Sequence, residues 1–466
     1  MNLLKHIKKY KKNNCIINEV GKILSYNDVV NECGLILNKT ETNNKKSLVF
    51  MLAENSEEFI FAYLSFFNKK FSQMLIDPKI DSLLLSKLIN NYQPDFIFYR
   101  TNKPLDLKNY SEIYKKRDFK IVKINSSKQF KINKNLALLL STSGSTGSKK
   151  FAKISYANIK DNTKNIIKYL KIKPDHLTIT TMPPYYTFGL SIINTHLYIG
   201  GSILINNLNI FDKNFWRLIK EKKVNSFGGV PYFYEILKKL NFDRIKLPNL
   251  KYFTQAGGKL DKNLKKYFLN YANKNKIKFL MMYGQVEATS RISYLPFKHA
   301  KKKIDSVGKA IPGGKVFLDT NKKDKEGEIL YKGKNVFMGY SENIKDLKED
   351  KTNMTLKTGD IGKIDKDGFI YIIGRKKREI KLYGNRVNLD EVEIILRNKN
   401  YDCYCVGKSD KIVIFNRSKK IAANEILSHI SKITNLNKNS FKINSLRELP
   451  LNSNGKISYK TLSDLA

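Results

Sequence analysis

Cysteine is rare in this sequence, and its distribution excludes a disulfide framework. Four of the 466 residues are cysteine, namely Cys15, Cys33, Cys403 and Cys405. The last two belong to a Cys-Tyr-Cys stretch, which lacks the spacing of a zinc knuckle. A chain of this length can bury a large core and does not depend on cross-links. We therefore expect reduced cysteines and a cytoplasmic protein.

The sequence also lacks the long apolar segments that direct a chain to a membrane. The stretch Met1 to Asn14 is basic but has no apolar centre, so it does not fit a signal peptide. The stretch Leu177 to Ile210 contains no Asp, Glu, Lys or Arg, yet prolines, glycines, asparagines and threonines interrupt it. These interruptions favour buried strands, turns and a helix over a membrane span. We expect a soluble protein without a transmembrane segment.

Acidic residues and histidines are scarce too. The 42 Asp and Glu residues face 86 Lys and Arg residues, which gives a formal net charge of +44. Such a charge is typical of proteins that bind nucleic acids or anionic membranes. The lysines are spread over nearly every segment, however, and no nucleic-acid-binding module is present. We expect no specific nucleic-acid partner, only a field that favours anionic substrates, and we assign no role to the five histidines.

The length suits two or three folding units, and a hydrophobic fraction of 41% is enough for a large interior. Apolar runs of strand length alternate with segments of helical spacing, which predicts an α/β fold with a largely parallel sheet covered on both faces. From Gly308 to Tyr371, short strands and glycine turns predict a small barrel-like element. A compact α+β segment follows it and extends to Ala466. The predicted strands include 47–52, 96–99, 121–124, 176–182, 202–205 and 278–282, and the predicted helices include 56–67, 214–221 and 232–240.

The most informative stretch begins with the apolar run Leu136 to Leu140, which has the length of a buried strand. A loop rich in serine, threonine and glycine comes next, and Lys149 and Lys150 end it. Its glycines let backbone amides turn inward, its hydroxyls add donors, and a lysine adds positive charge. Such a loop is suited to hold a polyphosphate, although it does not match the Walker pattern.

A flexible Ser/Gly turn would have a similar composition. Two features count against that interpretation. The loop directly follows the buried-strand pattern, and Ser155 is placed to cap a helix whose apolar face includes Ile159 and Ile166.

The loop resembles the phosphate loop of the adenylate-forming superfamily, which includes acyl-CoA synthetases, luciferases and adenylation domains of peptide synthetases. The superfamily pattern is Thr-Ser-Gly-Ser-Thr-Gly-x-Pro-Lys, and Lys149 stands here in place of its proline. The resemblance implies that the loop binds the β- and γ-phosphates of ATP and that Thr146 faces a magnesium ion. The matching residues are Thr142, Ser143, Gly144, Ser145, Thr146, Gly147 and Lys150.

A second motif, Tyr283-Gly-Gln-Val-Glu287, comes at the end of an apolar run. Ligands of open α/β sheets bind beyond the carboxyl ends of strands. The motif is similar to Tyr-Gly-x-Thr-Glu of the superfamily, which implies that Tyr283 packs on adenine and that Glu287 is a catalytic magnesium ligand. Val286 replaces a threonine whose hydroxyl normally faces the α-phosphate. Thr289 or Ser290 could supply that hydroxyl instead.

Further motifs occur in the superfamily's order. The resemblance implies that Gly257 and Gly258 line the adenine pocket, that Asp360 binds both ribose hydroxyls and that Arg375 faces the nucleotide. Three residues near the C-terminus complete the pattern. They are the hinge residue Lys377, Gly384 in the tunnel for the thiol, and the catalytic residue Lys456 in the pattern Leu-Pro-x-x-x-x-Gly-Lys.

The resemblance also implies an architecture and a reaction. It predicts a large N-terminal domain of stacked sheets at residues 1–375 and a small, mobile α+β domain at residues 376–466. ATP and Mg²⁺ would convert a carboxylic acid into an acyl-adenylate with release of pyrophosphate, and coenzyme A would then accept the acyl group. One alternative acceptor is the phosphopantetheine thiol of a carrier protein. Another alternative is a catalytically weakened relative that serves as a binding or scaffold protein.

The expected acyl pocket includes Tyr185, Tyr186, Phe188 and Gly228. Amino-acid-activating members of the superfamily place an aspartate in this region to pair with the α-ammonium group. No acidic residue lies near Thr187, which argues against an amino acid and for a fatty or aryl acid. An aromatic stripe of this kind is also consistent with ordinary core packing.

Overall fold

The structure is a computed structural model that describes most of the chain. Contact clustering divides the chain into two compact units, and each is described by itself. The first unit comprises residues 1–304, 310–315 and 332–356, and the second comprises 305–309, 316–331 and 357–466. The predicted boundary after residue 375 falls within the second unit and stays a prediction. The described residues are 3–40, 46–102, 105, 107, 109–125, 130–141, 150–320, 325–382, 385–408, 411–418, 421–434, 436–452 and 455–466.

The first unit contains an eight-stranded sheet whose central strands are parallel. Its strands are apolar on both faces, as in sheets that are covered on both sides. Antiparallel strands complete both edges. In spatial order the strands are β19 (Tyr340–Ser341), β9 (Phe151–Ser155), β8 (Leu136–Ser141), β4 (Ser72–Ile76), β3 (Leu48–Leu52), β5 (Phe96–Arg100), β7 (Phe119–Ile124) and β6 (Tyr110–Lys116).

A nine-stranded sheet forms the second large layer, and its middle strands are also parallel. The motif around Tyr283 lies at the carboxyl end of one of these strands. In spatial order the strands are β16 (Lys309–Ala310), β15 (Ser293–Tyr294), β14 (Lys278–Tyr283), β13 (Tyr252–Gln255), β12 (Ser226–Gly229), β10 (Leu177–Ile179), β11 (Ser202–Leu204), β1 (Asn14–Ile17) and β2 (Ile23–Ser25).

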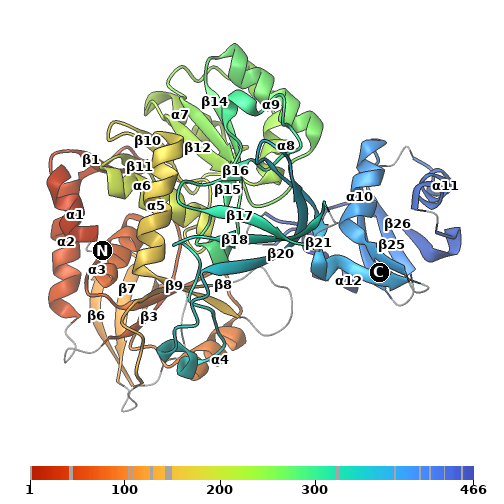
Figure 1. The fold of residues 1–466 in the computed structure, drawn as a ribbon. Coiled ribbons are helices and arrows are strands. Elements are labelled where there is room, and N and C mark those ends of the chain that lie inside the picture. Colours follow the sequence, from red (N-terminus) through yellow and green to blue (C-terminus); the bar gives the residue numbers. More distant parts are fainter. Residues whose placement is uncertain are drawn as a thin grey trace. The chain divides into compact units, whose positions relative to one another are not determined.

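Helices alternate with these strands along the first unit, as Figure 1 shows. Ser155 caps the helix that follows β9, because its hydroxyl accepts the backbone N–H of Asn158, so the predicted cap is confirmed. The α-helices are α1 (Leu3–Ile7), α2 (Tyr26–Lys39), α3 (Glu57–Asn68), α4 (Ser82–Tyr92), α5 (Tyr156–Leu170), α6 (Thr187–Ile199), α7 (Lys213–Glu221), α8 (Pro231–Lys239) and α9 (Lys262–Lys274). The 3₁₀ segments are η1 (Lys8–Tyr10), η2 (Phe242–Arg244), η3 (Val286–Ala288), η4 (Phe297–His299) and η5 (Ile344–Lys348).

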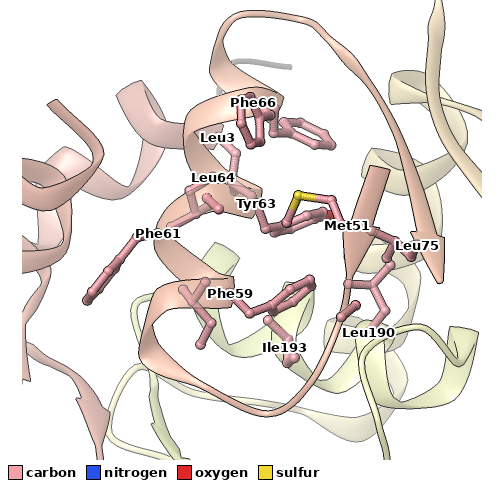
Figure 2. Close-up of a cluster of buried hydrophobic side chains, with 14 of the residues drawn as sticks. Leu3, Met51, Phe59, Phe61, Tyr63, Leu64, Phe66, Leu75, Leu190 and Ile193 are labelled. Carbon is pink, nitrogen blue, oxygen red and sulfur yellow. The ribbon is translucent and has the colours of Figure 1, made fainter. Parts of the chain in front are cut away.

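The largest apolar core of the first unit is shared by elements of both large sheets, with α3 between them. Figure 2 shows Phe59 and Tyr63 of α3 directed toward Met51 of β3 and Ile193 of α6. All four side chains are 1% exposed or less. A helix that is apolar around its whole circumference is typical of a fully buried position. The predicted α/β class is therefore confirmed.

None of the helices in the described parts of the chain has the length and apolar character that a membrane crossing requires.

The second unit is built from smaller sheets. The short strands predicted between residues 308 and 371 contribute to a four-stranded sheet. Its strands are β17 (Lys315–Asp319), β18 (Gly327–Lys332), β20 (Thr355–Ile364) and β21 (Ile370–Arg375). The α+β segment comprises η6 (Lys376–Arg378), β22 (Glu379–Leu382), β23 (Asn385–Asn388), α10 (Leu389–Asn398), β24 (Cys403–Lys408), β25 (Lys411–Asn416), α11 (Ala423–Thr434), η7 (Lys438–Ser440), β26 (Phe441–Ser445) and α12 (Tyr459–Asp464).

A buried carboxylate joins several elements of the second unit. The side chain of Glu393 on α10 is only 3% exposed and pairs with Arg378 and Arg397, each at 2.8 Å. Its Oε2 also accepts the hydroxyl of Tyr459 at 3.0 Å, and its Oε1 accepts the backbone N–H of Cys405 at 2.9 Å. Glu393 thereby connects η6, β24 and the start of α12.

We expect Glu393→Gln to destabilise this segment by about 3 kcal/mol, because breaking a buried ion pair leaves guanidinium groups without their counter-charge. Hydrogen exchange of the backbone amides in β24 and α12 measures the change in local stability. The matched control is Glu221→Gln, which breaks the exposed pair between Arg217 and Glu221 on α7. That control should change stability by less than about 0.5 kcal/mol. Equal effects of the two substitutions would contradict this account.

Candidate active site

The structure describes only the end of the predicted phosphate loop. Thr142, Ser143, Gly144, Ser145, Thr146 and Gly147 lie outside the described residues, and so does Gly384. Lys150 directly precedes β9, and its Nζ lies 2.8 Å from Oε1 of Glu342, with both side chains about half exposed. The strand β19 ends at Ser341, which pairs with Phe151 of β9. The loop therefore returns to the sheet beside a short strand from a distant part of the sequence.

Tyr283 and Glu287 lie on a tight turn between β14 and β15. Gly284 makes the turn possible, because a Cβ atom at this position would lie 2.1 Å from the carbonyl oxygen of Ser290. No residue other than glycine allows the two backbone segments to approach so closely. Ile292 then donates its N–H to the carbonyl of Tyr283 and starts the return strand. The turn therefore fixes the backbone position from which the side chain of Glu287 projects.

Residues 334–337 form hydrogen bonds with this turn. The Nδ2 group of Asn335 donates to the carbonyls of Ala288 at 2.7 Å and Arg291 at 2.8 Å. The N–H of Phe337 donates to the carbonyl of Glu287. The same segment is tied to the start of α5, where Nδ2 of Asn158 donates to the carbonyls of residues 334 and 336. Side-chain amides thus connect the helix after the phosphate loop to the turn that carries Glu287.

Glu287 has one identified side-chain partner. Its Oε1 accepts a hydrogen bond of 2.9 Å from the hydroxyl of Tyr340 on β19. Burial, and then the neighbouring carboxylate, raise the pKa of Tyr340 well above its usual range, so this hydroxyl stays a donor at neutral pH. One strand, β19, therefore supplies the partner of Glu287 and directly precedes Glu342, the partner of Lys150.

The residues that could replace the missing threonine hydroxyl have other roles in the turn. Val286 packs against the main apolar core. The hydroxyl of Thr289 donates to the carbonyl of Asn335 at 2.7 Å. The hydroxyl of Ser290 accepts from Nη1 of Arg291. Thr289 and Ser290 both have positive φ angles, of 52° and 121°, so the backbone is strained at these two residues.

The predicted acyl-pocket residues separate into two groups. Phe188 and Gly228 come together, because a Cβ atom on Gly228 would lie 2.9 Å from Cζ of Phe188. Tyr186 packs edge-on against Phe188, with ring centroids 6.5 Å apart. Tyr185 belongs instead to the main apolar core. Phe188 and Tyr186 belong to a separate, smaller apolar cluster, so the aromatic stripe divides between two apolar clusters, and the acyl pocket stays a prediction.

The predicted adenine segment follows β13 at the same edge of the nine-stranded sheet. Gly257 has a φ of +88°, which favours glycine, and the Nε2 group of Gln255 donates to the carbonyl of Gly258 at 2.9 Å. The parallel register pairs Gln255 with Met281 of β14. The structure therefore brings this segment beside the strand that ends at Tyr283.

In the second unit, Asp360 and Arg375 are directly opposite each other on β20 and β21. Nε of Arg375 lies 3.3 Å from Oδ1 of Asp360, whose side chain is 9% exposed. The backbone before Asp360 is fixed by Thr358, whose hydroxyl donates to the carbonyl of Ile329. The structure therefore brings these two predicted nucleotide-binding residues together, and their roles stay predictions.

Lys456 lies on a hairpin-like turn in the second unit. Leu451 and Ile457 form an isolated bridge, and the Oδ1 atom of Asn452 accepts the N–H of Lys456 at 2.9 Å. Gly455, directly before Lys456, has a φ of +68°, a left-handed conformation that glycine adopts with little strain. Lys377 is part of η6, and its side chain lies outside the described residues.

Among the residues that the structure describes, no group of three or more His, Cys, Asp or Glu side chains could hold a metal ion. Thr146, the other predicted magnesium ligand, lies outside the described residues.

Sequence reasoning missed three residues that shape the site. Tyr340 and Glu342 come from a short strand without a recognisable motif, and only tertiary pairing brings them to Glu287 and Lys150. Arg291 had a weak signal, because it is a charged residue flanked by the apolar strand sequence that follows the turn. It is 3% exposed and lies over the ring of Phe188, with its Cζ 4.5 Å from the ring centroid.

The chain is similar to known proteins in sequence and in fold. The profile of a family described as AMP-binding enzyme matches residues 4–341. The chain is 28% identical over 355 residues to luciferin 4-monooxygenase of Luciola mingrelica, a match that covers 71% of this chain and 64% of that protein. The chain therefore spans less than two thirds of that relative's length.

Two further similarities extend over more of the chain. It is 24% identical over 424 residues to 2-succinylbenzoate–CoA ligase of Lactococcus lactis, which covers 89% of this chain and 90% of that protein. The structure of o-succinylbenzoate CoA synthetase from Bacillus subtilis with its acyl-adenylate intermediate superposes with a TM-score of 0.80 at 18% identity, over 99% and 98% of the two chains. The structural likeness establishes the fold.

We expect Gly284→Ala to destabilise the protein by about 1–3 kcal/mol, because the added methyl group would force the carbonyl of Ser290 away. The midpoint of urea unfolding measures the change. Gly34→Ala on α2 is the matched control, since a Cβ atom there meets nothing within 4 Å. The control should stabilise the helix by up to about 1 kcal/mol. A Gly284→Ala protein as stable as the unmodified chain would contradict the close-packed turn.

Proposed function

The chain belongs to the AMP-binding enzyme family, and from that premise we propose that it is an AMP-forming carboxylate–CoA ligase. In the first half-reaction, the carboxylate attacks the α-phosphate of ATP, and pyrophosphate leaves. In the second, the thiol of coenzyme A attacks the acyl-adenylate, and AMP leaves. A free carboxylate resists a nucleophile because of its charge and its poor leaving group. Adenylation removes both obstacles.

The arrangement around β19 is the observation that carries the proposal. Glu287 bonds Tyr340 on β19, and Lys150 pairs with Glu342, which directly follows that strand. A reaction at phosphorus depends chiefly on positioning and on neutralising charge. A carboxylate for a cation and a lysine for a phosphate, held by one rigid strand, are suited to that task. We assign the loop from Thr142 to Lys150 to the β- and γ-phosphates.

The Glu287 carboxylate fits a magnesium ion. The hydroxyl of Tyr340 occupies its Oε1, and within the described residues Oε2 has no hydrogen-bond partner. Carboxylate and phosphate oxygens are the ligands that Mg²⁺ prefers, and the bound ion neutralises charge on the phosphate oxygens. We place Tyr283, Gly257 and Gly258 at the adenine.

We propose that residues of the second unit bind the ribose of the nucleotide. We also propose that part of this unit moves between the two half-reactions. Asp360 would accept hydrogen bonds from both ribose hydroxyls, with Arg375 beside it. Lys456 would stabilise charge at the α-phosphate during adenylation. Movement about Lys377 would then withdraw Lys456 and open the thiol path past Gly384. The small movable domain would comprise residues 376–466.

The proposal also specifies the thiol acceptor and the class of acid. Coenzyme A is the acceptor proposed here, and a carrier-protein phosphopantetheine is its rival. The sequence favours a fatty or aryl acid, and the cytoplasm is the expected location. Two features favour a weakened relative: Lys149 stands in place of the superfamily's proline, and Val286 packs against the core and offers no hydroxyl.

We expect Lys456→Ala to lower acid-dependent ATP–pyrophosphate exchange by about 10²–10³-fold, since one charge-stabilising contact is lost. Thioester formation from a synthetic acyl-adenylate and coenzyme A should be nearly unchanged. Lys460→Ala, at an exposed position four residues later, serves as the control and should leave both half-reactions intact. Equal loss of both half-reactions in Lys456→Ala would contradict the assigned role.

We expect Val286→Thr to keep or raise the rate of ATP–pyrophosphate exchange, because the hydroxyl of threonine would be restored toward the α-phosphate. The substitution also places a hydroxyl against apolar core, so unfolding should show a loss of about 1 kcal/mol. Exchange and thermal unfolding are measured on the same preparation. A collapse of exchange without unfolding would show that Val286 belongs to a different local arrangement.

A further inference from the structure

The residues on the two sides of Lys377 are bound to different parts of the second unit. On the upstream side, Nζ of Lys376 lies 3.1 Å from Oε2 of Glu328 on β18, a carboxylate that is 7% exposed. The other oxygen of Glu328 accepts the N–H of Gly359 at 3.1 Å. Lys376 is therefore held to the four-stranded sheet, beside the turn that precedes Asp360.

Arg378, on the downstream side, is bound to the α+β segment. Its guanidinium pairs with Asp390 at 2.9 Å and with Glu393 at 2.8 Å, both on α10. It also donates to the carbonyl of Cys405 on β24 at 2.7 Å. A planar guanidinium with several donors can hold a helix and a strand at once. A single residue of the chain, at position 377, separates these contacts from those of the upstream side.

Tyr459, at the start of α12, belongs to the same downstream group of contacts. Its ring lies against Arg378, with Cζ of the guanidinium 3.7 Å from the ring centroid. Its hydroxyl donates to Oε2 of Glu393 at 3.0 Å. The side chain also packs against an apolar cluster that includes Tyr404 and Leu462. A partly desolvated cation over an aromatic face is attractive in addition to the ion pairs, so Tyr459 is held by its ring and by its hydroxyl.

Tyr459 follows Lys456 by three residues, and hydrogen bonds fix the backbone between them. The N–H of Ser458 donates to the carbonyl of Pro450 at 2.7 Å. The N–H of Asn452 donates to the carbonyl of Lys456 at 2.7 Å, and Oδ1 of Asn452 accepts the N–H of Lys456 at 2.9 Å. A displacement of the Tyr459 ring would therefore be transmitted to the backbone of Lys456.

We propose that Tyr459 is a positioning residue for Lys456. Through its contact with Arg378, it makes the lysine move as one body with the chain that directly follows residue 377. The inference rests on the proposed function, in which movement about Lys377 withdraws Lys456 after adenylation. Hinges absorb large changes of backbone angle at a few residues. The contacts of Tyr459 convert such a change into a defined displacement of the lysine, and they hold its orientation during adenylation.

A tyrosine that only stabilised the fold would behave differently. Its loss would lower the free energy of unfolding and the fraction of active protein, so both half-reactions would decline equally. A positioning residue for Lys456 affects only the half-reaction that uses this lysine. The ratio of the two half-reactions therefore distinguishes the two roles.

We expect Tyr459→Leu to lower kcat of acid-dependent ATP–pyrophosphate exchange by about 10–10²-fold, because a small misplacement of a catalytic group is costly. Thioester formation from a synthetic acyl-adenylate and coenzyme A should be nearly unchanged. The control is Tyr110→Leu, which removes an exposed tyrosine beside Lys120 on β6 and should leave both half-reactions intact. A folded Tyr459→Leu protein with unchanged exchange, or with equal loss of both half-reactions, would overturn the inference.

The full-length chain is assayed with the best acid from a panel that includes acetate, octanoate, palmitate, benzoate and 2-succinylbenzoate. Absence of exchange with every acid of the panel would overturn the proposed function. Exchange that falls in Lys456→Ala but not in Tyr459→Leu would overturn the inference and leave the proposed function intact.

The double variant Lys456→Ala/Tyr459→Leu tests whether the tyrosine acts through the lysine. Exchange by the double variant should be close to that of Lys456→Ala alone, because the effects of residues that act as a unit are not additive. Losses that multiply would show that Tyr459 acts independently of Lys456 and would overturn the inference.

Tyr459→Phe keeps the ring over Arg378 and loses only the hydroxyl, so exchange should fall by about 3-fold, less than in Tyr459→Leu. Thermal unfolding establishes that each variant is folded. If Tyr459→Leu does not fold, the two half-reactions of Tyr459→Phe decide. Selective loss of exchange would then support the inference, and unchanged exchange or equal loss of both half-reactions would overturn it.

Discussion

The close approach of Gly284 to the carbonyl of Ser290 is the constraint on which the site of the first unit depends. A methyl group at residue 284 has no room, so the backbone can fold back on itself within a few residues. This short return places Glu287 and Arg291 on one turn. The proposed magnesium ligand and a buried arginine are therefore positioned by a single backbone feature, and a displacement of the turn would affect both.

Side chains that are distant in the sequence form hydrogen bonds that fix this turn and the segment beside it. Asn335 holds the turn, and Asn158 holds the segment around Asn335. Neither amide would touch a substrate in the proposed mechanism. Functional residues on loops need such support from a rigid scaffold, and here the scaffold is the edge of the eight-stranded sheet at β9 and β19. The proposed chemistry thus depends on contacts between segments almost two hundred residues apart.

Much of this could be predicted from the sequence, for reasons visible in particular residues. The buried run at Leu136 and the cap at Ser155 are local signals, and β8 and α5 begin where those signals predict. Asp360 and Arg375 were singled out from the order of motifs, whereas their ion pair is visible only in the structure. Tyr340 could not be found in this way, because its role arises from long-range strand pairing. Arg291 could not be assigned either, since only the structure shows that its neighbours carry no negative charge.

The central claim is that a carboxylate oxygen of the acid attacks the α-phosphate of ATP. Labelling the carboxylate of an acid that supports ATP–pyrophosphate exchange with ¹⁸O, and allowing a full turnover with ATP, Mg²⁺ and coenzyme A, tests this step directly. When the thiol displaces AMP from the acyl-adenylate, the bridging oxygen leaves with the phosphate. The account predicts AMP that carries one ¹⁸O atom by mass spectrometry. AMP without the label, or label appearing in inorganic phosphate together with ADP, would contradict it.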